Sequence, residues 1–383
     1  MSSHLPWINA LRSVPTGLSA HFQGLTNNLS GMKLERRTLL AHAMMFCVCM
    51  LFGLMNVVIE WGLPEPASNA TLVDKVSAGL AFTFMRDLVA ALALGLIALP
   101  TLMFEPATRN KLQRDFGKVC VGAIFFIGGM VPFVVGVALT NASTAVLFQP
   151  LVPVMTTAFA VLVGIEPRNW IRAIAILLAV AGTIVTIDKG SLSLSSGVGL
   201  ACLVVNALSL PIWLNALRTM RARSDPHDPL ALNATVYLVG MPFVGLCCLC
   251  WWAAPGTGDQ LWLALGLLCG NWWSIVAVLY CGLLGSALTY FLINFSAAYM
   301  FPSVLTLWCA AQPVATLPFA YAAFGEVPAP IQFVGCGLIA AGLLMCTAVS
   351  YKEERERMKG QEQLLTNADE PSESFSYRPP EVS

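Results

Sequence analysis

Seven polar or aromatic residues lie inside long apolar runs and are the best candidates for holding a solute: Asn56, Gln149, Asn206, Trp213, Tyr290, Asn294 and Gln312. Amide and hydroxyl groups donate and accept hydrogen bonds without carrying charge. In a membrane such groups are expected to face protein or a cavity. Together they predict a cavity wall suited to an uncharged or zwitterionic solute. The alternative is hydrogen bonding between helices without ligand contact, worth about 0.6 kcal/mol each.

Arg86 and Asp87 are the only adjacent charges inside a predicted membrane helix. An ionisable residue there is a functional candidate by default. Arg86 suits a carboxylate or a phosphate, and Asp87 suits a coupling proton. However, we expect Arg86 near the outer helix end, where its side chain reaches the interface. Since neighbours in a helix point about 100° apart, the two residues need not pair. The sequence favours anchoring or gating over substrate contact.

The pattern Pro-Val-x-Thr occurs twice, as Pro153 to Thr156 and as Pro313 to Thr316. A proline inside a helix removes one backbone hydrogen bond and frees a carbonyl. In a membrane that carbonyl must face protein or water, and the threonine one turn later is placed to compensate. The two patterns predict either a pair of kinks beside a central cavity, with a gating role, or kinks that serve only packing.

Several other kinds of chemistry lack the residues they need. The 12 cysteines lie mostly in apolar runs with no histidine or acid nearby, which indicates packing rather than a metal site. No clustered nucleophile machinery, nucleotide-binding loop or basic patch is present, so we expect no enzyme activity, no cofactor, no metal and no nucleic-acid partner. Asn69 begins a glycosylation sequon.

The elements that must position these residues are membrane helices. Apolar residues make up 57% of the chain and charged residues only 11%, too few charges for a soluble domain of 383 residues. A membrane-spanning helix needs about 20 mostly apolar residues. We count ten such runs, at 40–62, 78–100, 117–139, 143–164, 168–187, 197–217, 230–253, 272–294, 301–324 and 331–350.

The placement of basic residues sets the expected orientation. The net charge is zero, from 21 basic and 21 acidic residues. If the N-terminus is cytosolic, the cytosolic segments near the ten runs carry 16 Lys and Arg, and the opposite side only Lys75 and Lys189. Cytosolic loops are enriched in Lys and Arg. We therefore expect a multi-pass protein with both termini cytosolic, in the plasma membrane or an endomembrane.

An internal repeat divides the chain. Shifted by 160 positions, the segment 141–187 aligns with 301–347, and Pro153, Glu166 and Gly182 meet Pro313, Glu326 and Gly342. The shift spans five helices, so the second copy is inverted, as in secondary transporters. We expect a cytosolic segment 1–38, five-helix repeats 39–188 and 189–350, and a disordered tail 351–383.

These motifs resemble a known family. The runs NASTAVLFQPLVPVMTTAFAVLVGIE at 141–166 and FPSVLTLWCAAQPVATLPFAYAAFGE at 301–326 are similar to the EamA repeat of the drug/metabolite transporter superfamily, and FTFMRDLVAALALGLIAL at 82–99 is similar to its second helix. The plant nodulin-like, walls-are-thin-type members look closest. The resemblance implies an all-α polytopic membrane protein of ten helices in two inverted five-helix repeats.

The expected function is secondary transport of a small, uncharged or zwitterionic organic metabolite, such as an amino acid, by alternating access. One alternative is a nucleotide-sugar or phosphate-ester antiporter of an internal membrane, which would need deep basic residues. Another is a receptor-like or scaffold subunit that transports nothing. The expected partners are the solute and membrane lipid, and the sequence leaves open whether the chain forms a homodimer.

Overall fold

The structure is a computed structural model of the 383-residue chain. It describes residues 34–64, 70–140, 142–146, 148–149, 151–164, 169–186, 194–221, 227–300, 302–325, 330–331, 333–335, 337–338, 340–342, 344–345, 348–349, 352–353 and 356. Asn69, Glu166, Glu326 and the segment 1–33 lie outside the described residues, so the predictions made for them are not taken further.

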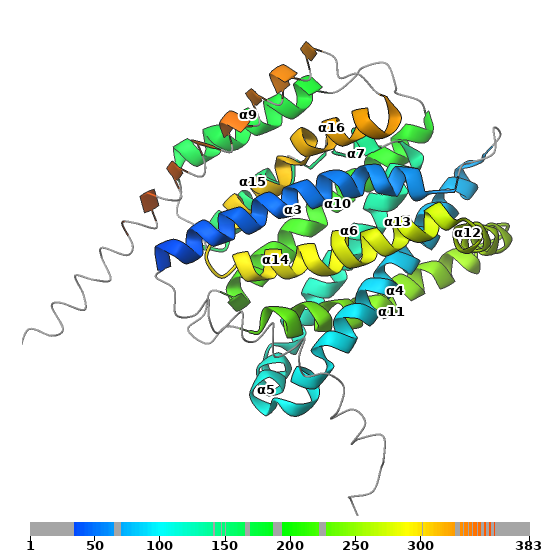
Figure 1. Cartoon of the computed structure of the whole chain (residues 1–383), viewed down its shortest axis with the longest axis horizontal. Coiled ribbons are helices and arrows are strands. Elements are labelled where there is room, and N and C mark those ends of the chain that lie inside the picture. Colours follow the sequence, from blue (N-terminus) through cyan, green and yellow to red (C-terminus); the bar gives the residue numbers. More distant parts are fainter. Residues whose placement is uncertain are drawn as a thin grey trace, which may run out of the picture.

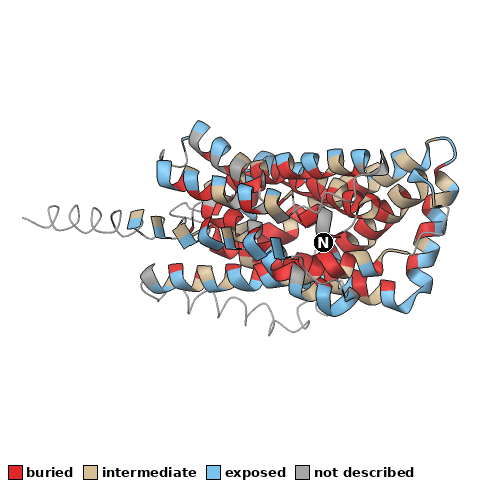
Figure 2. Cartoon of the chain, turned by 90° about the horizontal axis from the view of Figure 1, so that it is seen from above, coloured by how far each residue is buried: buried red, intermediate tan, exposed pale blue. Residues whose placement is uncertain are grey.

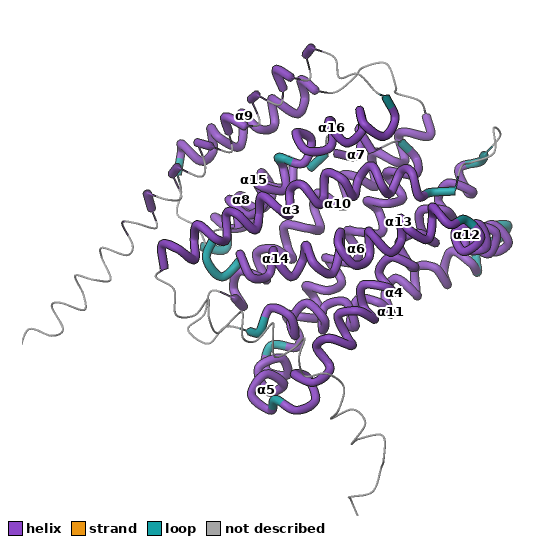
Figure 3. The backbone as a smooth tube through the Cα atoms, in the orientation of Figure 1, coloured by secondary structure: helices purple, strands orange, loops and turns teal. Residues whose placement is uncertain are grey.

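The described residues form helices and no strands (Figure 3). The elements, in chain order, are α3 Leu34–Gly62, α4 Leu72–Phe104, α5 Pro106–Arg114, α6 Phe116–Leu139, α7 Ala142–Val146, α8 Leu151–Leu162, α9 Trp170–Thr186, α10 Leu194–Arg221, α11 Pro229–Trp252, α12 Gly258–Gly270, α13 Trp272–Gly282, η1 Leu283–Leu288, α14 Thr289–Ser296, α15 Pro302–Ala310 and α16 Gln312–Phe324. η1 is a π-helical segment that joins α13 to α14 in one rod.

Within the described part of the chain, six helices are long and apolar enough to cross a membrane. They span Arg36–Gly62, Leu72–Phe104, Phe116–Leu139, Gly197–Arg221, Pro229–Trp252 and Trp272–Ser296. Shorter apolar helices lie at Trp170–Gly182, Val314–Ala323 and Phe333–Gly342. The long rods lie side by side in one bundle, with α9 at its edge (Figure 1).

Two of the expected continuous spans are broken. The run 143–164 forms α7 and α8, and the run 301–324 forms α15 and α16. With the repeat offset of 160, the start of α8 at Leu151 corresponds to position 311, one residue before α16 begins. Discontinuous helices at membrane depth are tolerated where they are buried in protein or line a cavity. The breaks therefore mark equivalent places in the two repeats.

The helix α4 is longer than the expected run of 78–100. It begins at Leu72 because Thr71 and Asp74 form a capping box, with the Thr71 side chain accepting from the Asp74 backbone and the Asp74 carboxylate accepting from the Thr71 backbone. This earlier start places Arg86 fourteen residues, or about 21 Å, from the helix N-terminus. The interpretation of Arg86 as a residue near the outer helix end is therefore wrong.

The segment between the seventh and eighth apolar runs, expected to be a loop, contains the helix α12. Figure 1 shows α12 nearly end-on, crossing the direction of the long rods. Trp262 of α12 and Trp272 and Trp273 of α13 are exposed. Because tryptophan is enriched where a membrane meets water, these residues indicate that α12 lies along that boundary.

Buried residues fill the centre of the bundle and exposed ones cover its outside (Figure 2). Glycines allow the closest helix contacts. A Cβ on Gly53 of α3 would lie 2.6 Å from the Ala315 Cβ of α16, and one on Gly122 of α6 would lie 2.5 Å from the Trp213 ring of α10. Small residues permit such backbone approach where lipid removes the hydrophobic drive for association.

Candidate functional site

A small cavity lies in the middle of the bundle. Its volume is about 20 Å³, and it is lined by Phe52, Met55, Asn56, Met130, Phe133, Gln149, Asn206, Leu210, Leu214, Tyr290, Ile293 and Gln312. A volume of roughly 10–15 Å³ admits one water molecule, so the cavity is nearly closed in this conformation. Its wall combines apolar side chains with two types of uncharged polar side chain, the amide and the phenol.

Asn56 links α3 to α16 at one side of this cavity. Its Nδ2 donates to Gln312 Oε1 and to Thr316 Oγ1, both at 3.4 Å. All three side chains are buried, and Asn56 Oδ1 has no hydrogen-bond partner in the structure. An unpartnered buried amide oxygen is costly, so it is a ready acceptor for a solute donor.

Asn206 also lines the cavity. It is buried on α10, and its Nδ2 donates to the carbonyl of Gly129 on α6 at 2.9 Å. A Cβ on Gly129 would lie 3.1 Å from Ser209 Cβ, so the glycine lets α6 and α10 come close at this point. The amide is thereby fixed in position where the cavity begins.

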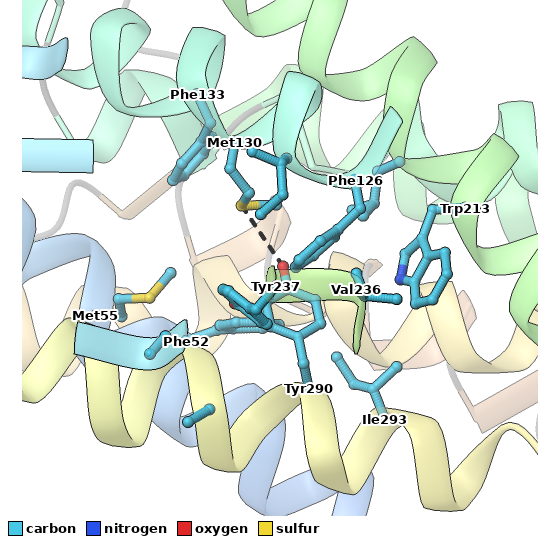
Figure 4. Packing of buried hydrophobic residues seen from close by; sticks show 14 of the residues in the cluster. Phe52, Met55, Phe126, Met130, Phe133, Trp213, Val236, Tyr237, Tyr290 and Ile293 are labelled. Atoms are coloured by element: carbon cyan, nitrogen blue, oxygen red, sulfur yellow. Dashed lines mark hydrogen bonds between the residues drawn. The ribbon is translucent and has the colours of Figure 1, made fainter. Parts of the chain in front are cut away.

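An aromatic cluster packs around Tyr290, a residue of the cavity lining (Figure 4). Tyr290 packs edge-on against Phe52 and Phe126, with ring centroids 5.6 and 4.4 Å apart, and its hydroxyl contacts Met130 Sδ at 3.6 Å. Phe126 in turn packs against Trp213 and Tyr237, at 5.8 and 5.5 Å. Tyr290 is the member of this cluster that reaches the cavity with a polar group.

Five of the seven predicted solute-binding residues line this one cavity: Asn56, Gln149, Asn206, Tyr290 and Gln312. Trp213 and Asn294 do not line it. Trp213 is buried behind Phe126, and Asn294, one turn after Tyr290, is buried with neither side-chain polar atom hydrogen-bonded. The sequence analysis missed the apolar lining residues, although Phe52, four residues before Asn56, shares its helix face.

The two prolines lie where helices begin rather than in the middle of a helix. Pro153 is the third residue of α8, and Pro313 is the second residue of α16. A proline in the first turn removes no intrahelical hydrogen bond. Thr156 Oγ1 donates to the Val152 carbonyl at 2.8 Å, whereas Thr316 Oγ1 accepts from Asn56. The repeated pattern marks the starts of two half-helices, and its gating role stays a prediction.

Arg86 and Asp87 form an ion pair, although as sequence neighbours they were expected to have no need to pair. Arg86 Nε and Nη2 lie 2.9 and 2.7 Å from Asp87 Oδ1. The side chains are 1% and 0% exposed, so Arg86 does not extend to the interface as expected. The two side chains turn toward each other because both charges are buried and neither can be solvated by water. Neither residue lines the cavity.

Charged residues at the ends of α6, α10 and α11 make contacts between distant segments. His227 Nε2 lies 3.0 Å from Asp115 Oδ2. This contact joins the residue before α6 to the segment before α11. Arg218 and Arg221 donate to the carbonyls of Ala297 and Asn294, respectively. Basic side chains at these last carbonyls of α14 stabilise the helix end. Only the tertiary structure shows that these residues connect distant segments.

No group of three or more His, Cys, Asp or Glu side chains capable of holding a metal ion occurs among the described residues. A helical bundle with membrane-length helices, two helices broken at equivalent positions, and a cavity lined by both apolar and polar side chains is typical of a polytopic membrane protein of the transporter type. The model of the EamA-like transporter family matches residues 39–187 and 198–348. The chain belongs to this family of membrane transporters, which confirms the internal duplication.

A solved structure entitled "Crystal structure of protein" has a similar fold. It is 17% identical in sequence, with a TM-score of 0.56, and the match covers 82% of this chain and 98% of that one. At this identity the similarity concerns the fold alone. It shows that the helical arrangement is one that an experimentally determined protein adopts.

Proposed function

We propose that this protein is a secondary transporter of a small organic metabolite, uncharged or zwitterionic, that works by alternating access. Its ten helices would form two inverted five-helix halves, with both termini in the cytosol. The observation that carries the proposal is that residues from both repeats line the cavity. Asn56 and Gln149 come from the first family match, whereas Asn206, Tyr290 and Gln312 come from the second. Transporters built from repeats bind their solute where the repeats meet.

The small volume of the cavity supports a site that opens only when the protein changes conformation. At about 20 Å³ it is too small for any metabolite in this conformation. Both helix breaks lie beside the cavity. Gln149, two residues before α8, and Gln312, the first residue of α16, line it. A rocking of the two repeats against each other would open the same residues to one side at a time.

The chemistry of the wall favours an uncharged or zwitterionic solute. The lining residues carry amides, a phenol, thioethers and hydrocarbon, and none is ionised. A phosphate ester or nucleotide sugar would bring at least one negative charge into this space, where an unpaired charge is costly. The antiporter alternative would therefore need a basic residue at the wall, and Arg86 is instead paired with Asp87.

Reconstitution tests this proposal. Purified protein in liposomes would be loaded with unlabelled solute and assayed for counterflow of ¹⁴C-labelled amino acids, nucleosides and sugars, with a UDP-sugar as the anionic comparison. We expect counterflow of a neutral or zwitterionic class that decreases in Gln149→Leu and Asn56→Leu proteins. Gly245→Ala is the control, because a Cβ there meets nothing within 4 Å. Counterflow of the UDP-sugar alone would favour the antiporter, and flux of no solute would favour the scaffold alternative.

A further inference from the structure

The ion pair of Arg86 and Asp87 lies deep in the bundle and has no role in the proposed solute site. Among the described ion pairs it alone has both residues within a membrane-length helix. Asp87 lies fifteen residues after Leu72 and seventeen before Phe104, so it is about 22 Å from one end of α4 and about 25 Å from the other. The pair is therefore at mid-depth of the bundle.

The hydrogen bonding of the pair is incomplete. Asp87 Oδ1 receives both contacts from Arg86, at 2.9 and 2.7 Å. Asp87 Oδ2 and both Nη atoms of Arg86 are buried and have no hydrogen-bond partner among the described residues, although Nη2 lies within ion-pair distance of Oδ1. Polar groups left in this condition are costly, and those that persist at membrane depth are by default functional. One carboxylate oxygen thus holds the arginine while the other remains available to a further ligand.

We propose that Asp87 is a proton-binding site and that its proton drives the transport cycle. The proton adds to Oδ2, the oxygen without a partner, and gives a neutral carboxylic acid. This inference rests on the proposed function, because it assigns the coupling ion to that transporter. It requires no partner molecule other than the hydronium ion of the aqueous phases.

Protonation of Asp87 would be coupled to the conformation of the protein because it leaves the charge of Arg86 unpaired. When Asp87 becomes neutral, Arg86 remains as a buried charge without compensation, and breaking a buried pair in this way is strongly destabilising. The protonated protein therefore disfavours the packing seen here and favours one in which the guanidinium reaches water. A ligand that prefers one of two conformations shifts the population between them, which is what coupling requires.

The π-helical segment η1 connects the pair to the cavity. Gly282, just before η1, approaches α4 so closely that a Cβ on it would lie 2.9 Å from the Arg86 carbonyl oxygen. Gly285, within η1, would place a Cβ 2.5 Å from Sδ of Met55, a cavity residue, and Tyr290 follows two residues after η1 ends. π-Helical turns occur often at functional sites. These contacts form a route by which a shift of α4 at Arg86 would move Met55 and Tyr290, two residues of the cavity lining.

The other ionisable groups that act on the pair are few. Tyr237 of α11 interacts electrostatically with both Arg86 and Asp87, and Cys281 of α13 interacts with Arg86. In the described part of the chain, no ionisable side chain from α6, α12 or η1 acts on Arg86 or Asp87. A phenol and a thiol both stay neutral at ordinary pH. Asp87 is consequently the group in this cluster that changes charge between acid and neutral pH.

The first test uses proteoliposomes and a ¹⁴C-labelled mixture of the protein amino acids. The variant is Arg86→Gln with Asp87→Asn, which keeps the site neutral overall and avoids an unpaired arginine. The control is Asp74→Asn, an acid of the same helix that lies in its exposed first turn. One proton per solute sustains an accumulation of about tenfold for each pH unit across the membrane.

We expect wild type and Asp74→Asn to accumulate label uphill in a pH gradient of one polarity. The double variant should retain counterflow without a gradient, and its accumulation should fall to onefold. The assignment would be overturned if the double variant accumulated label in a pH gradient as well as wild type does. It would also be overturned if wild type showed counterflow but accumulated no label in a pH gradient of either polarity.

The second test is independent of any solute. Infrared difference spectra of the purified protein between acid and neutral pH should contain a band of a protonated buried carboxyl group that the double variant lacks and Asp74→Asn keeps. If the band persists in the double variant or is absent from wild type, the proton site is refuted even when counterflow is normal. If the band behaves as expected while no solute is transported, the proposed function fails and the proton site stands.

Discussion

The contact between α3 and α16 at Gly53 should limit both the stability and the solute site of this protein. In a Gly53→Ala variant the new Cβ would lie 2.6 Å from Ala315 Cβ and 3.0 Å from the Ala315 carbonyl carbon. Carbon atoms pack at about 3.5–4.0 Å, so the shortfall is roughly 1 Å. Neither neighbour can rotate away, because one is backbone and the other is bonded directly to it. The two helices must separate at this point.

The energetic effect follows from two opposing terms. Overpacking a tight contact costs about 1–3 kcal/mol, whereas replacing glycine by alanine within a helix gains up to about 1 kcal/mol. The Gly245→Ala control has only the gain, since a Cβ there meets nothing within 4 Å. The helix-propensity term cancels between the two variants. We therefore expect Gly53→Ala to be less stable than Gly245→Ala by about 1–3 kcal/mol.

The functional effect follows from Asn56, which lies one turn after Gly53 on α3. Its contacts to Gln312 and Thr316, at 3.4 Å, are already long for hydrogen bonds, and a further separation of roughly 1 Å would end them. Counterflow should decrease together with stability. The stability is measured by thermal unfolding in detergent, followed by tryptophan fluorescence.

A second substitution separates the packing argument from a general defect. In Gly53→Ala with Ala315→Gly the closest contact, at 2.6 Å, is removed, while backbone atoms at 3.0 and 3.1 Å remain. Part of the lost stability and counterflow should return. The reasoning is refuted if Gly53→Ala unfolds at the same temperature as Gly245→Ala or above it, or if the second substitution makes the protein still less stable.

Three further outcomes are expected. Asn206→Leu removes the 2.9 Å hydrogen bond to an α6 carbonyl, and because interhelical hydrogen bonds are worth about 0.6–1.7 kcal/mol, the free energy of unfolding in detergent should fall by about that amount. Glu353→Gln weakens the 2.5 Å ion pair with the buried Arg172, so the free energy of unfolding should fall by about 1–3 kcal/mol and protease should cut sooner after α16. Asp115→Asn weakens its contact with His227 at 3.0 Å, so unfolding in detergent should occur at a lower temperature; an unchanged temperature would contradict a stabilising role for this contact.

The class of fold could be predicted from the sequence because it depends on local composition. Apolar runs long enough to cross a membrane, together with scarce charge, leave helices as the structures that satisfy the backbone. The duplication was equally visible, since equivalent prolines, acids and glycines recur at one spacing, and the family matches at 39–187 and 198–348 agree with it. The polar residues that line the cavity could be selected because amides inside apolar runs must face protein.

The errors in the prediction concern where helices begin and end. The breaks before α8 and α16 do not follow from proline spacing alone, since a proline can also kink a helix without ending it. The depth of Arg86 depended on where α4 begins, and the capping box at Thr71 moved that start by about two turns. The helix α12 was hidden because its apolar residues are too few for a span.

The sequence by itself determined a duplicated helical membrane protein and a short set of polar candidates. Only the tertiary structure decided which candidates meet. Asn56 and Gln312 are 256 positions apart and touch because Gly53 allows α3 to approach α16. Asn294 shares the same rod as Tyr290 yet lies outside the cavity wall, because side chains one turn apart along a rod end at different depths. These contacts depend on where helices cross. Helical periodicity predicts on which face of its helix a residue lies, but it does not predict which residue of another helix packs against it.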